Sequence, residues 1–103
     1  MYRAAIRAHA PQPEALLEGL KSLKESLSSF CSTVERPGWL LAGCGDVLIK
    51  AVVELRAEGT YRMTSETVLL IVLEGREPVA LVEKAKTVVS ILTLSGLASV
   101  LES

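Results

Sequence analysis

Aromatic residues are scarce in this sequence, and their scarcity excludes one class of partner. They make up 4% of the 103 residues, whereas hydrophobic residues as a whole make up 50%. Proteins that bind single-stranded nucleic acid stack successive bases on aromatic rings, and so small a set does not supply such a platform. The apolar content is therefore aliphatic. It predicts that residues 1–103 form one domain, because a chain of about 100 residues builds a single core.

Neither sign of charge predominates. Eleven Lys and Arg residues face twelve Asp and Glu residues, which gives a formal net charge of −1. No long-range field therefore draws the protein onto phosphate backbones or anionic lipid. The uncharged run 87–101 has fifteen residues, whereas a helix that spans a bilayer needs about 20 mostly apolar residues. We interpret this run as part of a buried helix and predict no membrane partner.

Reactive side chains are few as well. Cys31 and Cys44 are thirteen positions apart, without the spacing of zinc or redox sites, and His9 is the only histidine. We therefore expect two reduced thiols in a cytoplasmic protein, with no metal and no cofactor. No nucleophile motif accompanies them, so we predict that the protein is not an enzyme. Asparagine is absent and Gln12 is the single side-chain amide, which is typical of proteins from hot habitats.

The spacing of apolar residues predicts a strand followed by a helix at the start of the chain. Residues 2–9 alternate between apolar and polar positions, with the period of a half-buried strand. Pro13 suits the first position of a helix. The apolar residues of that helix recur at spacings of four and three: Leu16, Leu20, Leu23, Leu27 and Phe30. We expect a loop over 28–37.

The segment 47–58 admits two interpretations. Its apolar residues alternate as in a strand, yet Leu48, Val52 and Leu55 also fit one face of a helix. We favour a strand, because β-branched residues are frequent in the segment and suit a pleated surface. The continuous apolar run 67–73 then predicts a central strand, and Pro78 begins a second helix.

These elements predict an α+β fold with two layers. The order is strand, helix, two or three strands, helix. Such an order is typical of an antiparallel sheet of three to four strands with both helices on one face.

The second helix carries more apolar residues than contact with one sheet requires. Leu81, Ala85, Val88 and Leu92 already form a core stripe. We therefore predict an interface with another chain that consists of Val88, Ile91, Leu94, Leu97, Val100 and Leu101. In the alternative interpretation, the helix bends at Gly96 and packs its end onto its own domain.

A basic stripe is the one nucleic-acid signal in the sequence. Arg3 and Arg7 share one face of the first strand. Lys50 and Arg56 join Arg3 and Arg7 if the strand that begins at Val47 lies next to the first strand. These four residues are candidate contacts to RNA, although direct readout by stacked aromatics is not expected. The alternative is a polar, solvent-facing side of the sheet.

The C-terminal third resembles a known protein family. An apolar strand at 67–73, a short polar break at 74–77 and a long aliphatic helix from Pro78 are similar to the small dimerising subunit of the KEOPS complex, which supports threonylcarbamoyl modification of tRNA adenosine. The resemblance implies a non-catalytic subunit that dimerises and scaffolds a catalytic partner.

Two hypotheses of function follow. The first is a non-catalytic association subunit, either a homodimer or the small subunit of a larger intracellular assembly, which contacts nucleic acid only indirectly. The second is a small ligand-binding or enzymatic domain whose site forms between subunits and uses Arg3, Arg7, His9 and glutamate residues.

Overall fold

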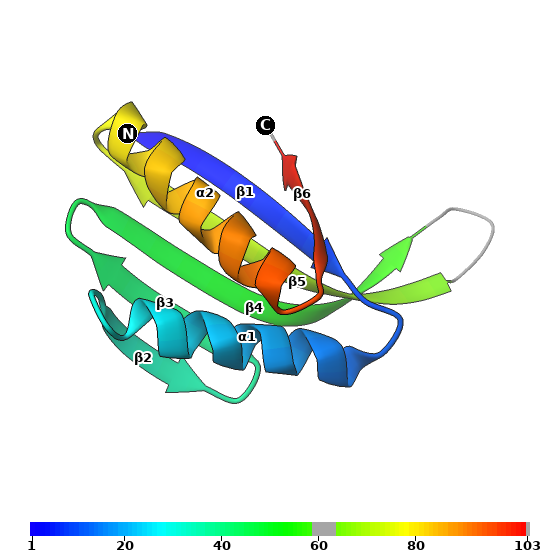
Figure 1. Ribbon diagram of the computed structural model, residues 1–103. Coiled ribbons are helices and arrows are strands. Elements are labelled where there is room, and N and C mark those ends of the chain that lie inside the picture. Colours follow the sequence, from blue (N-terminus) through cyan, green and yellow to red (C-terminus); the bar gives the residue numbers. More distant parts are fainter. Residues whose placement is uncertain (59–63, 103) are drawn as a thin grey trace.

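The computed structural model describes the backbone of residues 1–58 and 64–102, and the side chains of residues 1–54 and 67–101. The described residues form six strands and two helices (Figure 1). In chain order these are β1 (Tyr2–His9), α1 (Pro13–Leu27), β2 (Ser32–Arg36), β3 (Trp39–Cys44), β4 (Val47–Glu58), β5 (Thr64–Gly75), α2 (Pro78–Leu94) and β6 (Ala98–Glu102).

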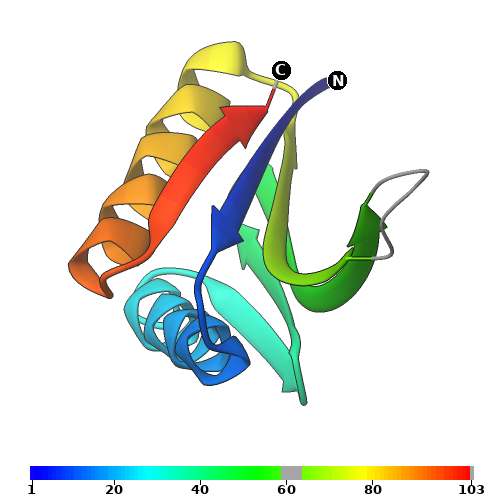
Figure 2. The same cartoon turned by 90° about the vertical axis from the view of Figure 1, so that its right-hand side faces the viewer.

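The strands form one antiparallel sheet in the order β2-β3-β4-β5-β1-β6. Figure 2 shows both helices on the same face of this sheet. The predicted α+β class and antiparallel sheet are therefore confirmed, and the strand number is larger than the three or four expected. The additional strands are β2, which replaces the loop expected over 28–37, and β6 at the end of the chain.

Burial explains why β4 is a strand and why β2 was missed. In β4, Val47, Ile49 and Ala51 are buried against the helices, so the strand interpretation of 47–58 is confirmed. In β2, by contrast, four of five residues are exposed. An edge strand of this kind needs no apolar alternation, because neither of its faces is fully covered.

α1 follows its predicted apolar stripe. Pro13 occupies its first turn, and Leu16, Leu20, Leu23 and Leu27 are all buried. The ammonium group of Lys24 lies 2.8 Å from the carboxylate of Glu35 on β2. The hydrogen bond and negative charge of Glu35 raise the pKa of Lys24 above its ordinary value. This ion pair connects α1 to the edge strand β2.

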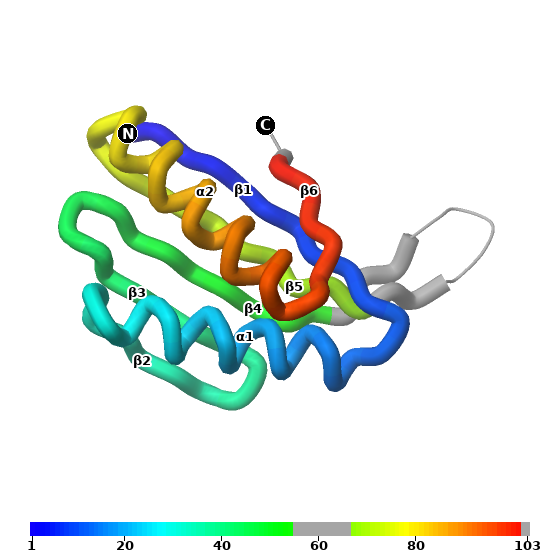
Figure 3. The backbone as a smooth tube through the Cα atoms, in the orientation of Figure 1, coloured from blue at the N-terminus to red at the C-terminus, as the bar shows by residue number. Residues whose placement is uncertain are grey.

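α2 ends at Leu94, so the expected continuous helix through 101 is wrong. Gly96 has a φ of 82°, a conformation that favours glycine. Its N–H donates to the Thr93 carbonyl at 3.0 Å, and the Leu97 N–H donates to the Leu92 carbonyl at 2.9 Å. These two bonds form a Schellman motif, which ends a helix and reverses the chain. The chain then returns along β1 as β6 (Figure 3).

A disulfide joins Cys31 to Cys44, with their Cα atoms 4.6 Å apart. The β2–β3 hairpin explains this proximity, because Ser32 is paired with Gly43 in the sheet. The prediction of two reduced thiols is therefore wrong. A cytoplasmic location loses the argument that rested on those thiols, since disulfides persist mainly in oxidising compartments.

Reduction of the disulfide should destabilise the domain. Cross-linking a loop of about 15 residues removes unfolded-state entropy that corresponds to about 3 kcal/mol. Urea unfolding followed by circular dichroism, with and without a phosphine reductant, measures the difference. The Cys44→Ser variant is the control and should unfold at the same urea concentration in both buffers. A wild-type midpoint that does not respond to the reductant contradicts the assignment.

Candidate functional site: an apolar groove beside the second helix

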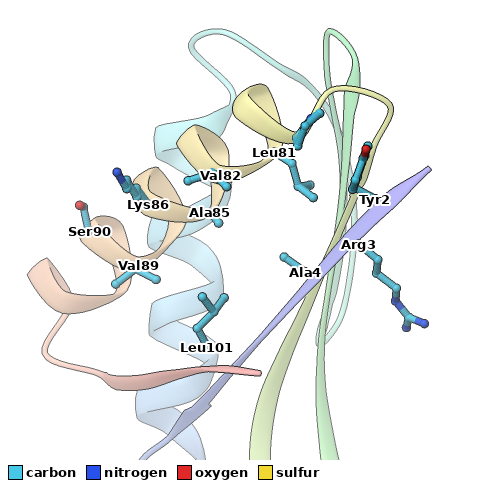
Figure 4. A pocket seen from close by; sticks show the side chains of 11 residues that line it. Tyr2, Arg3, Ala4, Leu81, Val82, Ala85, Lys86, Val89, Ser90 and Leu101 are labelled. Carbon is cyan, nitrogen blue, oxygen red and sulfur yellow. The ribbon is translucent and has the colours of Figure 1, made fainter. Parts of the chain in front are cut away.

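A groove of about 610 Å³ lies between α2 and the outer part of β1 (Figure 4). We call it the α2–β1 groove. Its lining consists of Tyr2, Arg3, Ala4, Pro78, Leu81, Val82, Ala85, Lys86, Val89, Ser90 and Leu101. Most of these side chains are apolar, and Figure 4 shows Leu81 and Leu101 directed into the space between helix and sheet. The groove therefore offers a surface for apolar groups.

Unequal strand lengths and small side chains create the α2–β1 groove. β6 pairs with β1 from Ala5 to His9 only. Tyr2 to Ala4 consequently have no outer neighbour among the described strands. Ala4 on the sheet and Ala85 on α2 are too short to fill the space between the two layers. The groove thus lies where the sheet lacks one strand segment.

The charged groups of the groove are cationic and lie at its margins. Arg3 extends to the opposite face of the sheet, and Lys86 points away from the groove (Figure 4). Among the described lining residues there is no carboxylate, imidazole or thiol. The groove therefore lacks the pairs of titratable groups that acid–base or nucleophilic catalysis requires. It is a candidate binding surface.

The structure does not bring the six predicted interface residues together. Val88 is fully buried and Leu97 is 5% exposed, so these two belong to the core and are not available to a partner. Ile91 packs against the core as well. Leu94 is 89% exposed and lies beside α1 residues such as Ser22 and Glu25. The reversal at Gly96 places Val100 and Leu101 on β6, apart from the predicted interface residues of α2.

Leu101 lines the α2–β1 groove, whereas Val100 is paired with Arg7 and lies on the opposite face of the sheet. The remaining groove residues were missed from the sequence. One signal was present: the groove residues Val82 and Val89 lie on α2 outside its core stripe. The space itself lies beside the residues of β1 that are not paired with described residues of β6, and no residue pattern indicates it.

The predicted basic stripe is interrupted. β5 lies between β1 and β4, so the condition that these two strands are neighbours is wrong. We call the face of the sheet opposite the helices the open face. Lys50 of β4 lies on it together with Arg3 and Arg7, but the half-buried Val72 of β5 lies between Lys50 and β1. The side chain of Arg56 lies outside the described residues.

The open face also carries the residues of the second hypothesis. Arg7 and His9 lie on β1 and Glu54 on β4, and each is engaged in interactions with other groups. Around them are half-buried apolar side chains, namely Trp39, Leu41, Leu48, Val52, Leu70 and Val72. The open face is therefore not the polar surface that was the alternative to a basic stripe. RNA contact at Arg3, Arg7 and Lys50 stays a prediction.

The described residues lack two further features. They contain no group of three or more His, Cys, Asp or Glu side chains that could hold a metal ion. Within the same residues, no helix is long and apolar enough to cross a bilayer. The absence of catalysis stays a prediction.

Comparison with known proteins identifies the fold and no family. No family model matches the chain, and no curated protein does. Among solved structures, the chain is similar to the NMR structure of PA4090 from Pseudomonas aeruginosa. The TM-score is 0.64 at 12% sequence identity, and the match covers 99% of this chain and 96% of that one. At this identity the likeness concerns the fold alone.

Leu97 and Leu94 should differ sharply when each is truncated to alanine. Leu97 packs where a Cβ on Gly19 of α1 would meet it, so Leu97→Ala leaves a cavity and should cost about 2–4 kcal/mol. Leu94→Ala removes an exposed side chain and should change the free energy of unfolding by less than about 0.5 kcal/mol. Urea unfolding measures both. Equal destabilisation would show that Leu97 does not anchor the end of the chain.

Proposed function

We propose that this domain is a non-catalytic association module that binds another protein chain through the α2–β1 groove. The observation that carries the proposal is an apolar groove of about 610 Å³ that is open beside an unpaired strand segment. Val79 and Val82 continue this surface onto the outside of α2, where they are 71% and 51% exposed. Monomeric proteins seldom leave large contiguous apolar patches in contact with water.

The domain itself has no further element to cover this surface among its described residues. Leu81, Ala85, Val88 and Leu92 already direct the core stripe of α2 toward the sheet. Val79 and Val82 lie outside that stripe, so they contribute nothing to the core. Covering them with a partner removes apolar area from water, which is favourable by about 25 cal/mol per Å².

The partner is either a second copy or a larger subunit of an intracellular assembly. The KEOPS-like assembly stays a prediction, and its long C-terminal helix is shorter here because α2 ends at Leu94. Nucleic acid would be reached indirectly, through the partner, because the open sheet face interrupts its basic residues with apolar ones. A cytoplasmic location stays a prediction from the sequence, and the disulfide between Cys31 and Cys44 counts against it.

A small apolar ligand is the second candidate for the α2–β1 groove. Its volume lies in the range of ligand pockets, which is about 300–1,000 Å³. Such pockets enclose most of the ligand surface and orient it by a few convergent polar groups. Here the two charged lining residues, Arg3 and Lys86, point out of the groove (Figure 4). We therefore favour a protein chain.

A charge placed in the groove should abolish association without unfolding the domain. Val82→Glu introduces a carboxylate into the apolar surface, and its desolvation on binding should cost several kcal/mol. Leu94→Glu is the matched control, because Leu94 is exposed outside the groove. We expect wild type and Leu94→Glu to exceed the monomer mass in light scattering, and Val82→Glu to be a folded monomer.

Binding of a hydrophobic dye separates the remaining cases. If the wild type is a monomer that binds the dye, and the Val82→Glu variant does not bind it, the groove is free in the wild type. It is then available to a different chain, as proposed. A wild-type monomer that binds no dye contradicts the proposal. A Val82→Glu variant that keeps the wild-type dimer mass contradicts the choice of surface.

A further inference from the structure

The α2–β1 groove is bounded on one side by an incomplete sheet edge, and this edge indicates the form of the partner. Resting on the proposed function, we infer that the groove binds a short extended segment of the partner chain. The segment adds to the sheet beside Tyr2 to Ala4. Its three central residues are apolar, acidic and apolar, in that order.

The backbone of β1 supplies the first argument. An antiparallel or parallel neighbour satisfies the outward N–H and C=O groups of a strand. β6 provides such a neighbour for Ala5 to His9, and among the described strands none does so for Tyr2 to Ala4. An extended segment placed there continues the line of β6 and completes the edge, which is the binding mode called β-strand addition.

The length of the open part of the groove supplies the second argument. Leu101 fills the end of the groove near Val89, and the part that remains faces α2 from Pro78 to Ala85 (Figure 4). Seven helical steps correspond to about 10 Å. From Tyr2 to Ala4, two strand steps correspond to about 7 Å. The open part is therefore long enough for an extended segment beside these three residues.

Side-chain alternation determines what the three residues are. Tyr2 and Ala4 line the groove, while Arg3 between them extends to the opposite face (Figure 4). Residues of the added segment opposite Tyr2 and Ala4 thus face Leu81, Val82 and Ala85, and favour aliphatic side chains. The residue opposite Arg3 lies beside its guanidinium group.

Charge determines the middle residue. On β5, the residue opposite Arg3 is Glu74, and Arg3 itself is exposed. A guanidinium group has five N–H donors, so Arg3 can donate to a carboxylate on its outer side. Oppositely charged residues that face each other across strands stabilise the pair. Glutamate or aspartate is therefore favoured opposite Arg3, and lysine is disfavoured.

The other outer edge of the sheet fits an added strand less well. β2 presents the charged and exposed Glu35 and Arg36, followed by Pro37. Charged residues and proline protect an edge against strand addition. At Tyr2 to Ala4, an edge of β1 without a neighbour among the described strands adjoins the α2–β1 groove.

Titration with synthetic peptides tests the inference. The probe is a blocked pentapeptide, Ser-Val-Glu-Leu-Ser, added to the isotopically labelled full chain, with amide and methyl shifts recorded by NMR. We expect shifts at Tyr2 to Ala4, Val82 and Leu101. Ser-Val-Lys-Leu-Ser should bind about fivefold more weakly. The Arg3→Glu variant should reverse this preference, and because Arg3 is exposed, the variant should fold.

N-methylation of the peptide tests strand addition itself. Alternate peptide amides face β1, so methylating the glutamate nitrogen and methylating the valine and leucine nitrogens should have unequal effects. One of the two peptides should lose about tenfold or more in affinity, while the other keeps most of it. Equal effects would mean that the peptide enters the groove without pairing to the edge.

The outcomes distinguish this inference from the proposed function. If Val82→Glu abolishes association but no peptide shifts the groove resonances, the extended segment is wrong and the association surface stands. If neither measurement responds, both are wrong. If palmitate displaces the dye from the groove and the peptides do not, the occupant is a small apolar ligand and the inference is overturned.

Discussion

The reversal of the chain at Gly96 determines most of what is distinctive in this domain. The Schellman motif ends α2 at Leu94 and directs the next five residues back along β1 as β6. Leu97 then packs against α1 where Gly19 has no side chain. This contact anchors the start of β6. The α2–β1 groove lies beside Tyr2 to Ala4, beyond the residues of β1 that are paired with β6.

The two outer edges of the sheet are stabilised by different means. At β2, the disulfide between Cys31 and Cys44 closes the hairpin, and the Lys24–Glu35 ion pair connects it to α1. At β6, the attachment is apolar packing of Leu97, with backbone pairing to β1. The β2 edge, which the disulfide closes, carries charged and exposed residues. The edge formed by β6 and the start of β1 adjoins the α2–β1 groove. The proposed binding surface is at the second of these edges, beside Tyr2 to Ala4.

The sequence was sufficient for elements whose apolar residues face one covered side. β1, α1 and the start of α2 belong to this group, because burial imposes a period that can be read. For β4 the pattern left strand and helix open, and the β-branched residues favoured the strand. The sequence did not predict β6, because Leu94, Leu97 and Val100 recur at the spacing of a helix. Gly96 between them does not by itself mark the end of a helix. β2 is too exposed to show a period, and the disulfide depends on the hairpin. The groove is formed by two alanines and a difference in strand length, so no motif represents it.

Intermolecular nuclear Overhauser effects in the complex test the central claim most directly. A methyl-labelled domain, mixed with an unlabelled second copy or with its isolated partner, reports which side chains the other chain contacts. The account predicts contacts to the methyl groups of Val82, Val89 and Leu101, which line the α2–β1 groove. Contacts confined to Leu94, or to Val52 and Leu70 on the open face of the sheet, would contradict it.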